Sequence, residues 1–273
     1  MPSYVKHRPK QRPKLGQNFL VSPTAQAAIV DALGDVSQRT VVEIGPGRGA
    51  ITTLLARRAQ RLVVIELDRD LAAALRDQFR EQPSVEILER DVLQTDFATL
   101  RAEGEPKLQV VGNLPYYITS DILLHLFAAH TAIERAVIML QREVAERVAA
   151  HPGTRDYGLL SATAQLYART ENLFTLPPSA FSPPPQVESS VLRLTMAPRF
   201  AELDVEPDPF LRFLRAGFAQ KRKMLARNLR NAGHDPSTIA AALAACHIDP
   251  QVRAEELDVS TMACLFRSLR PEP

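Results

Sequence analysis

Hydrophobic and polar positions follow two different rhythms along this chain. Short, nearly continuous apolar runs alternate with segments in which apolar residues return every three or four positions. The first pattern is typical of strands buried on both faces, and the second is typical of amphipathic helices. Strands are predicted at 40–44, 61–67, 85–88, 108–113, 135–140, 171–176 and 189–196, and helices at 50–59, 69–79, 120–130, 142–150 and 157–168.

This alternation predicts an α/β protein with a mostly parallel, doubly wound sheet and helices on both faces. The last two predicted strands have no helix between them, so we expect them to form an antiparallel edge pair. After residue 200 the strand pattern stops, and segments 206–233 and 236–246 have helical spacing. We therefore expect two domains, an α/β unit over residues 1–200 and a small all-helical unit over residues 201–273.

Composition is that of an ordinary globular protein, with 273 residues and 45% hydrophobic content. No apolar run approaches the roughly 20 residues of a membrane helix, and the first residues lack the apolar core of a secretion signal. We expect a cytoplasmic protein that does not enter a membrane. Cys246 and Cys264 lack the spacing of metal ligands, and a reducing compartment disfavours a disulfide. We expect two small unpaired core residues and no metal site.

Positive charge gathers in two segments, although the formal net charge is only +2. Lysine or arginine occupies positions 6, 8, 10, 12 and 14, and residues 1–30 contain no acid. A second window without acids runs from Pro209 to His234. Its cations are Arg212, Arg215, Lys221, Arg222, Lys223, Arg227 and Arg230. Two such segments on a near-neutral chain indicate a polyanionic partner, with nucleic acid as the leading interpretation.

A glycine-rich turn follows the first predicted strand in "VVEIGPGRGAIT". Gly45 and Gly47 allow a close approach of the backbone to a ligand, and Glu66 ends the next strand, where an acid can bind ribose hydroxyls. This pattern fits both a dinucleotide that transfers hydride and S-adenosylmethionine that transfers a methyl group. Glu43 before the turn and Asp91 after the third strand, placed for an adenine amino group, favour the methyl donor.

The stretch "GNLPYYIT" begins where the fourth predicted strand ends, beside the expected donor site. It resembles the N-[IL]-P-[YF] signature of methyltransferases that act on the N6 amine of adenine. The Asn113 side-chain oxygen and the Leu114 carbonyl can each accept a proton of that amine, which stabilises the charge that grows on its nitrogen. Pro115 fixes the turn that aims both groups inward, and Tyr116 offers a face for the base. Tyr117 is interpreted as packing.

These motifs together resemble those of the rRNA adenine N6-dimethyltransferases over about residues 12–270. The segments "KLGQNFL", "ERDVL", "AFSPPPQVESSVLRL" and "FAQKRKMLARNL" complete the resemblance. It implies a Rossmann-like class I methyltransferase sheet, S-adenosylmethionine as donor and S-adenosylhomocysteine as product. The residues implied to hold the donor are Asn18, Leu20, Gly45, Gly47, Glu66, Asp91 and Asn113.

The same resemblance implies roles for further residues. The catalytic site would comprise Asn113, Leu114, Pro115, Tyr116 and Phe181, with Phe181 closing over the target base opposite Tyr116. A basic C-terminal helix would bind RNA through Lys221, Arg222, Lys223 and Arg227, together with the basic N-terminal arm.

The implied substrate is a pair of adjacent adenines in the 3′-terminal hairpin of 16S rRNA. The implied partner is the 30S subunit or its late precursor, and the protein is expected to act as a monomer. Two alternatives stay open: an enzyme of the macrolide-resistance type that modifies large-subunit rRNA, and an assembly-checkpoint factor whose methylation is secondary. An NAD dehydrogenase would account for the glycine loop but not for "NLPYY" or the basic segments.

Overall fold

The structure is a computed structural model that describes residues 18–269. Within this range seven strands form one large sheet and two further strands form a short pair. The large sheet contains β2 (Thr40–Ile44), β3 (Arg61–Glu66), β4 (Val85–Glu89), β5 (Leu108–Asn113), β6 (Ile133–Gln141), β7 (Ala168–Leu176) and β9 (Ser189–Met196). The pair is β1 (Phe19–Leu20) and β8 (Phe181–Ser182). The predicted strands are confirmed, with differences confined to their ends.

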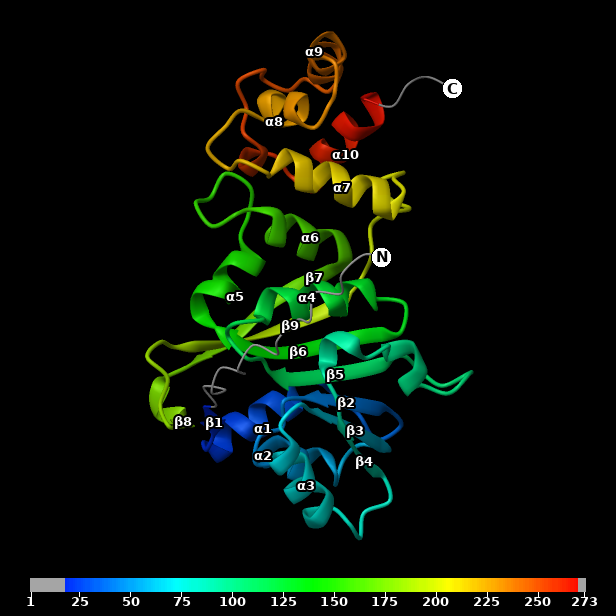
Figure 1. The fold of residues 1–273 in the computed structure, drawn as a ribbon, viewed down its shortest axis with the longest axis vertical. Coiled ribbons are helices and arrows are strands. Elements are labelled where there is room, and N and C mark those ends of the chain that lie inside the picture. Colours follow the sequence, from blue (N-terminus) through cyan, green and yellow to red (C-terminus); the bar gives the residue numbers. More distant parts are fainter. Residues whose placement is uncertain (1–17, 270–273) are drawn as a thin grey trace, which may run out of the picture.

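The strands of the large sheet follow the order β4-β3-β2-β5-β6-β9-β7 (Figure 1). Neighbours from β4 to β6 are parallel, whereas β9 runs antiparallel to both β6 and β7. The chain leaves β2 for β3 on one side and later returns to β5 on the other side. Loops that diverge at such a switch point leave a crevice at the carboxyl ends of the strands. The predicted doubly wound sheet and its antiparallel pair are confirmed.

Helices cover both faces of this sheet. Side chains of the first three helices pack with Val41 and Val111, and those of the next three pack with Val42 and Val110. Adjacent strand residues serve opposite faces because their side chains alternate. The helices are α1 (Pro23–Asp31), α2 (Ala50–Leu55), α3 (Arg69–Gln78), α4 (Thr119–Ala128), α5 (Arg142–Ala149) and α6 (Leu159–Tyr167), with short 3-10 turns η1 (Val92–Gln94), η2 (Phe97–Leu100) and η3 (Pro178–Ala180).

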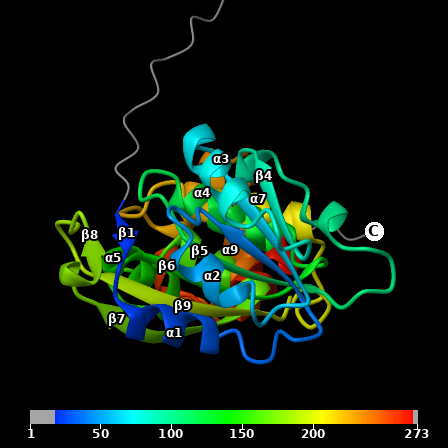
Figure 2. The same ribbon diagram turned by 90° about the horizontal axis from the view of Figure 1, so that it is seen from below.

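The β1–β8 pair holds the N-terminal segment beside the sheet. Leu20 pairs with Phe181, and the Val21 amide donates to the Ala180 carbonyl at 2.8 Å. Both views show the two short strands side by side (Figures 1 and 2). The pair connects segments far apart in the sequence, so it was not among the predicted elements. Helix α1 was also not predicted, because its alanine-rich sequence has little amphipathic pattern.

The remaining helices gather at one end of the molecule (Figure 1). They are α7 (Pro207–Gly217), α8 (Leu225–Asn231), α9 (Pro236–Ala245) and α10 (Val259–Ser268), with the 3-10 turn η4 (Ala254–Glu256). Their buried apolar side chains join the same core as α4 to α6. At the junction the rings of Tyr167 and Phe200 meet edge to face, with centroids 5.0 Å apart. The apolar core is therefore continuous past residue 200.

The segment over 206–233 is helical as expected, but the structure divides it into two helices, α7 and α8. Residues 218–223 form turns and bends, which replace the expected basic helix in this stretch. Asn228, which is 3% exposed, donates its side-chain amide to the carbonyls of Gly217 at 2.6 Å and Gln220 at 3.2 Å. Carbonyls at a helix end need such partners, and a buried amide supplies them here.

The expectation of two unpaired cysteines is also wrong. Cys246 at the end of α9 and Cys264 in α10 form a disulfide, and their Cα atoms lie 6.1 Å apart. Both residues are half-buried. The packing of α9 against α10 brings the two positions within the separation that a disulfide spans. Sequence spacing does not contain this information.

Gly112 provides a test of how closely the central strands approach. It lies opposite Ile44 in the β2–β5 pair, and an added Cβ would lie 2.9 Å from the Ile44 carbonyl oxygen. We expect Gly112→Ala to lower the free energy of unfolding by about 1–3 kcal/mol, because extra volume in a packed interior forces backbone shifts. Chemical denaturation measures this loss.

Gly158→Ala is the matched control, since its backbone is extended and no atom lies within 4 Å of the corresponding Cβ position. Equal stability of the wild-type protein and Gly112→Ala would contradict the close approach of β2 and β5.

Candidate active site

A glycine loop connects the central strand β2 to α2. Gly45, Gly47 and Gly49 all have positive φ, between 58° and 79°. There is also little space for a side chain at these positions. A Cβ on Gly47 would lie 2.8 Å from the Phe19 ring, and one on Gly45 would lie 3.2 Å from the Asn113 carbonyl oxygen. Only glycine meets both demands without strain. The loop therefore packs directly against β1 and the end of β5.

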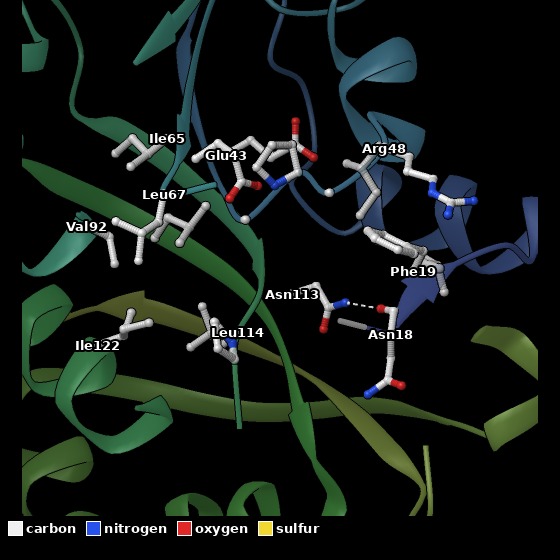
Figure 3. A pocket seen from close by; sticks show the side chains of 18 of the residues that line it. Asn18, Phe19, Glu43, Arg48, Ile65, Leu67, Val92, Asn113, Leu114 and Ile122 are labelled. Carbon is white, nitrogen blue, oxygen red and sulfur yellow. Dashed lines mark hydrogen bonds between the residues drawn. The ribbon is translucent and has the colours of Figure 1, made fainter. Parts of the chain in front are cut away.

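These segments enclose a cavity of about 400 Å³ at the carboxyl ends of the parallel strands. Figure 3 shows apolar side chains on one side of it, including Ile65, Leu67 and Val92, and polar groups on the other. All the residues predicted to hold the donor line this cavity. They are Asn18, Leu20, Gly45, Gly47, Glu66, Asp91 and Asn113. Of the predicted catalytic residues, Asn113, Leu114, Pro115 and Tyr116 line it.

Acidic side chains stand at the ends of successive strands around the cavity. Glu66 is 6% exposed and accepts a hydrogen bond from the Asp68 amide at 2.9 Å. Burial raises the pKa of Glu66, although backbone amides, including those of Asp68 and Gly47, oppose the shift. Asp91 accepts from the Leu93 amide at 2.9 Å, which fixes its carboxylate at the start of η1. The two acids are thus held by backbone donors in fixed positions.

Glu43 is a further acid in this cavity, beyond the residues predicted to bind the donor. It is 2% exposed, and burial raises its pKa to about 7, with Thr52 opposing the shift and the nearby Glu66 adding to it. Within residues 18–269, one of its carboxylate oxygens is buried with no hydrogen-bond partner. A buried polar atom without a partner is costly in an empty protein. This carboxylate oxygen is therefore available to a hydrogen-bond donor of a ligand in the cavity.

The Asn113 side chain has a defined orientation. Its Nδ2 donates to the Asn18 carbonyl at 3.1 Å (Figure 3). A carbonyl can only accept, so the amide nitrogen must face Asn18 and Oδ1 must face away from it. In the described part of the chain, neither Oδ1 nor the Leu114 carbonyl accepts a hydrogen bond. Two free acceptors therefore stand next to each other at the end of β5.

A tight turn follows these acceptors. The Ile118 amide donates to the Pro115 carbonyl at 3.2 Å, so Tyr116 and Tyr117 occupy the two corners of the turn. The Tyr116 hydroxyl lies 3.0 Å from the Ser189 hydroxyl, which holds its half-buried ring from β9. Tyr117 is 58% exposed and lines the cavity. Its interpretation as packing is therefore wrong, because the turn directs its side chain outward.

Phe181 lies apart from the cavity lining. It is 3% exposed in β8, where it pairs with Leu20 and packs in the apolar cluster below α1 and α2. Phe181 is therefore buried beside β1 and does not line the cavity. Its predicted closure over a base stays a prediction.

The predicted RNA-binding residues lie at the far end, around the turn before α8 and on α8 itself. Arg222, Lys223 and Arg227 are exposed. Lys221 is exposed too, but its Nζ donates to the Arg155 carbonyl at 2.5 Å and lies 3.8 Å from the Glu255 carboxylate. Lys221 therefore joins the loop after α5 to the C-terminal helices. The basic N-terminal arm lies outside the described residues.

Two arginines at the cavity were missed in the sequence. Arg48 stacks over the Phe19 ring at 4.5 Å from its centroid, and Arg90 precedes Asp91. Both are exposed. Arg48 lies within the glycine loop, and this position in the sequence could have identified it as a residue at the cavity.

The sheet distinguishes between the two cofactors that the glycine loop left open. Dinucleotide-binding domains use six parallel strands in the order 3-2-1-4-5-6. Here the antiparallel β9 separates β6 from β7. With this strand order and a cavity with one apolar wall at the carboxyl ends of the parallel strands, the fold defines a class I methyltransferase.

Comparison with known proteins gives the family. The profile described as ribosomal RNA adenine dimethylase matches residues 8–270. The chain belongs to this family. It is therefore an enzyme that uses S-adenosylmethionine to dimethylate adenine in ribosomal RNA and releases S-adenosylhomocysteine.

Two relatives are called ribosomal RNA small subunit methyltransferase A. The protein from Acidobacterium capsulatum is 60% identical over 95% of this chain and 92% of its own. The protein from Koribacter versatilis is 52% identical over 96% of both chains.

Two solved structures have a similar fold. A dimethyladenosine transferase from Plasmodium falciparum is 22% identical and covers 90% of this chain and 95% of its own, with a TM-score of 0.77. The 23S rRNA methyltransferase ErmE is 26% identical and covers 92% of this chain and 99% of its own, with a TM-score of 0.68.

The raised pKa of Glu43 predicts a pH-dependent stability. The unfolded chain releases this proton near 4.5, but the folded protein keeps it until about pH 7. The contribution of protonated Glu43 to the free energy of unfolding is therefore complete below pH 4.5 and is lost as the pH rises to about 7. Glu43→Gln has no charge to bury. We therefore expect the free energy of unfolding of this variant, relative to that of the wild type, to rise by on the order of 3 kcal/mol across this pH range. Urea denaturation at several pH values from 4 to 8 measures this difference. Parallel pH profiles for the two proteins would contradict it.

Proposed function

We propose that this enzyme dimethylates two adjacent adenines in the 3′-terminal hairpin of small-subunit rRNA. The observation that carries the chemistry is the Asn113 amide, whose Oδ1 faces away from Asn18 because Nδ2 donates to the Asn18 carbonyl. The choice of subunit is supported by relatives 60% and 52% identical that bear the small-subunit name. We further propose that the protein acts as a monomer in the cytoplasm, on the 30S subunit or its late precursor.

The chain holds the target amine through two acceptors. An exocyclic adenine amine has two protons and a lone pair delocalised into the ring. If Asn113 Oδ1 and the Leu114 carbonyl each accept one proton, the nitrogen is turned toward the cavity. The acceptors also stabilise the positive charge that grows on this nitrogen during attack. Pro115 keeps the two acceptors in a fixed relative orientation, because its ring restricts the backbone where β5 ends.

The remaining residues hold the donor and the base. S-adenosylmethionine supplies an electrophilic methyl group when it is bound. Glu66 would bind its ribose hydroxyls and Asp91 its adenine amine, while Gly45 and Gly47 would leave room for the rest of the donor; all four residues line the cavity. Tyr116 would stack on the target base, which is worth roughly 1–3 kcal/mol and helps offset the cost of unstacking it. We propose that Phe181 closes the other side of the base.

In this proposal the two parts of the chain have different functions. Residues 1–200 bind the donor and transfer the methyl group, and residues 201–273 bind rRNA through Arg222, Lys223 and Arg227. These three cations are exposed and have no acid partner among the described residues. Lys221 has partners on the protein, so its contribution to phosphate binding is expected to be smaller. The N-terminal arm would add further phosphate contacts.

A second candidate is methylation of large-subunit rRNA. It is favoured by the similarity to ErmE, which covers 99% of that chain. The higher identity to the small-subunit relatives outweighs it. A role as an assembly checkpoint is compatible with either substrate, because binding and catalysis use different parts of the chain.

Mapping of the methylated nucleotides tests the proposal. We expect the wild-type protein with labelled donor to modify two adjacent adenines near the 3′ end of rRNA in unmodified small subunits. Asn113→Ala is expected to abolish transfer, because one of the two acceptors is lost, while donor binding measured by calorimetry is largely kept. Label on purified large subunits instead would refute the choice of substrate, and normal turnover of Asn113→Ala would refute the role of the amide.

The RNA-binding surface is tested by its dependence on salt. Each phosphate contact releases counterions, so the logarithm of affinity falls with the logarithm of salt concentration with a slope of about 0.9 per contact. We expect Arg222→Ala with Lys223→Ala to weaken binding to small subunits and to lower this slope by about one to two. The control pair is Arg76→Ala with Arg80→Ala at the end of α3, far from α8 in Figure 1. An unchanged slope for the first pair would show that these cations contact no phosphate.

A further inference from the structure

Exposed apolar side chains gather at the catalytic cavity. Large hydrophobic side chains that are exposed within residues 18–269 number six, and three of them line this cavity. Those three are Val21, Leu67 and Tyr117. Leu67 follows Glu66, on the side proposed to hold the donor. Tyr117 is the most exposed of the six at 58% and follows Tyr116, on the side proposed to hold the base.

The backbone beneath Tyr117 is fixed, but its ring has no partner. The Pro115 carbonyl accepts from the Ile118 amide at 3.2 Å and from the Thr119 hydroxyl at 3.0 Å, which braces the turn against the start of α4. Within the described residues, the Tyr117 side chain makes no hydrogen bond and no ring contact. A tyrosine on a rigid turn offers a flat surface at low cost in conformational entropy.

The proposed substrate contains a group that needs such a surface. A base that enters the cavity is joined through the RNA backbone to a neighbouring nucleotide, which must lie outside it. Adjacent Cα atoms are about 3.8 Å apart, so the rings of Tyr116 and Tyr117 start from neighbouring points of the turn. One ring faces the cavity and is held by Ser189, and the other faces solvent at the mouth.

We propose that Tyr117 is a positioning residue that stacks on the base adjacent to the target adenine. This inference rests on the proposed function, since it requires a polynucleotide substrate. Aromatic stacking accepts any base because every base has a flat π face. Tyr117 would therefore hold the flanking nucleotide without reading its identity. With two adjacent adenines as targets, the adenine that waits for methylation would occupy this surface.

Steady-state kinetics on unmodified small subunits test the inference. We expect Tyr117→Ala to raise KM for the subunit about tenfold, the size expected for one lost base stack. kcat at saturating subunit and the Kd for the donor should stay within about twofold, because Tyr117 touches neither the target amine nor the donor. Tyr117→Phe should restore the wild-type KM, whereas Tyr117→Leu should not. Leu124→Ala, an exposed apolar residue of α4 outside the cavity, is the control and should change nothing.

A change in the RNA separates stacking from other causes. Small subunits are reconstituted with rRNA that is abasic at the nucleotide on one or the other side of the target. If Tyr117 stacks on the flanking base, removing that base on the relevant side raises KM for the wild type and abolishes its difference from Tyr117→Ala. An undiminished difference on both abasic RNAs would overturn the proposal, as would an unchanged KM for Tyr117→Ala. A wild-type protein that methylates no small-subunit adenine would instead refute the proposed function itself.

Discussion

The hydrogen bond from the Asn113 side chain to the Asn18 carbonyl is the contact on which the geometry of the candidate active site depends. It joins the end of the fourth parallel strand to a segment 95 positions earlier in the chain. It also decides which end of the amide faces the cavity, because a carbonyl can bind only the nitrogen end. The β1–β8 pair supports it by holding Phe19 and Leu20 in place. The catalytic geometry thus depends on pairing between chain segments as much as on the local motif.

Electrostatics in the cavity follow from the same burial that forms it. Glu43 and Glu66 lie in consecutive parallel strands; desolvation is the main cause that disfavours the charged form of each, and the nearby charge of Glu66 adds to the effect at Glu43. Buried acids of this kind destabilise the empty protein and favour a ligand that brings hydrogen-bond donors or positive charge. Affinity for the donor and a cost in stability therefore have one physical origin. The glycine loop makes this possible, since it brings the backbone close without filling the space.

The C-terminal helices depend on contacts that cross the expected boundary near residue 200. Tyr167 packs against Phe200 directly before this boundary, and Lys221 reaches across it from the turn before α8 to the loop after α5. The Gly153 amide adds a hydrogen bond to the Glu255 carbonyl at 2.8 Å. These contacts connect the cations proposed to bind RNA to the part of the chain that forms the cavity.

The sequence by itself determined the strands of the large sheet, the glycine loop and the strand-end residues Glu66, Asp91 and Asn113. These features rest on local rules: apolar runs form buried strands, and the carboxyl ends of parallel strands meet at one edge. Only the tertiary structure decided the rest. Helix α7 ends where buried Asn228 binds the Gly217 carbonyl, Lys221 is held by Arg155, Cys246 bonds to Cys264, and Phe181 is buried in the pair with β1. Tyr116 and Tyr117 occupy the two corners of one turn. Ser189 on a distant strand holds only Tyr116, so Tyr117 stays exposed. Each of these outcomes depends on partners remote in sequence, which no local pattern encodes.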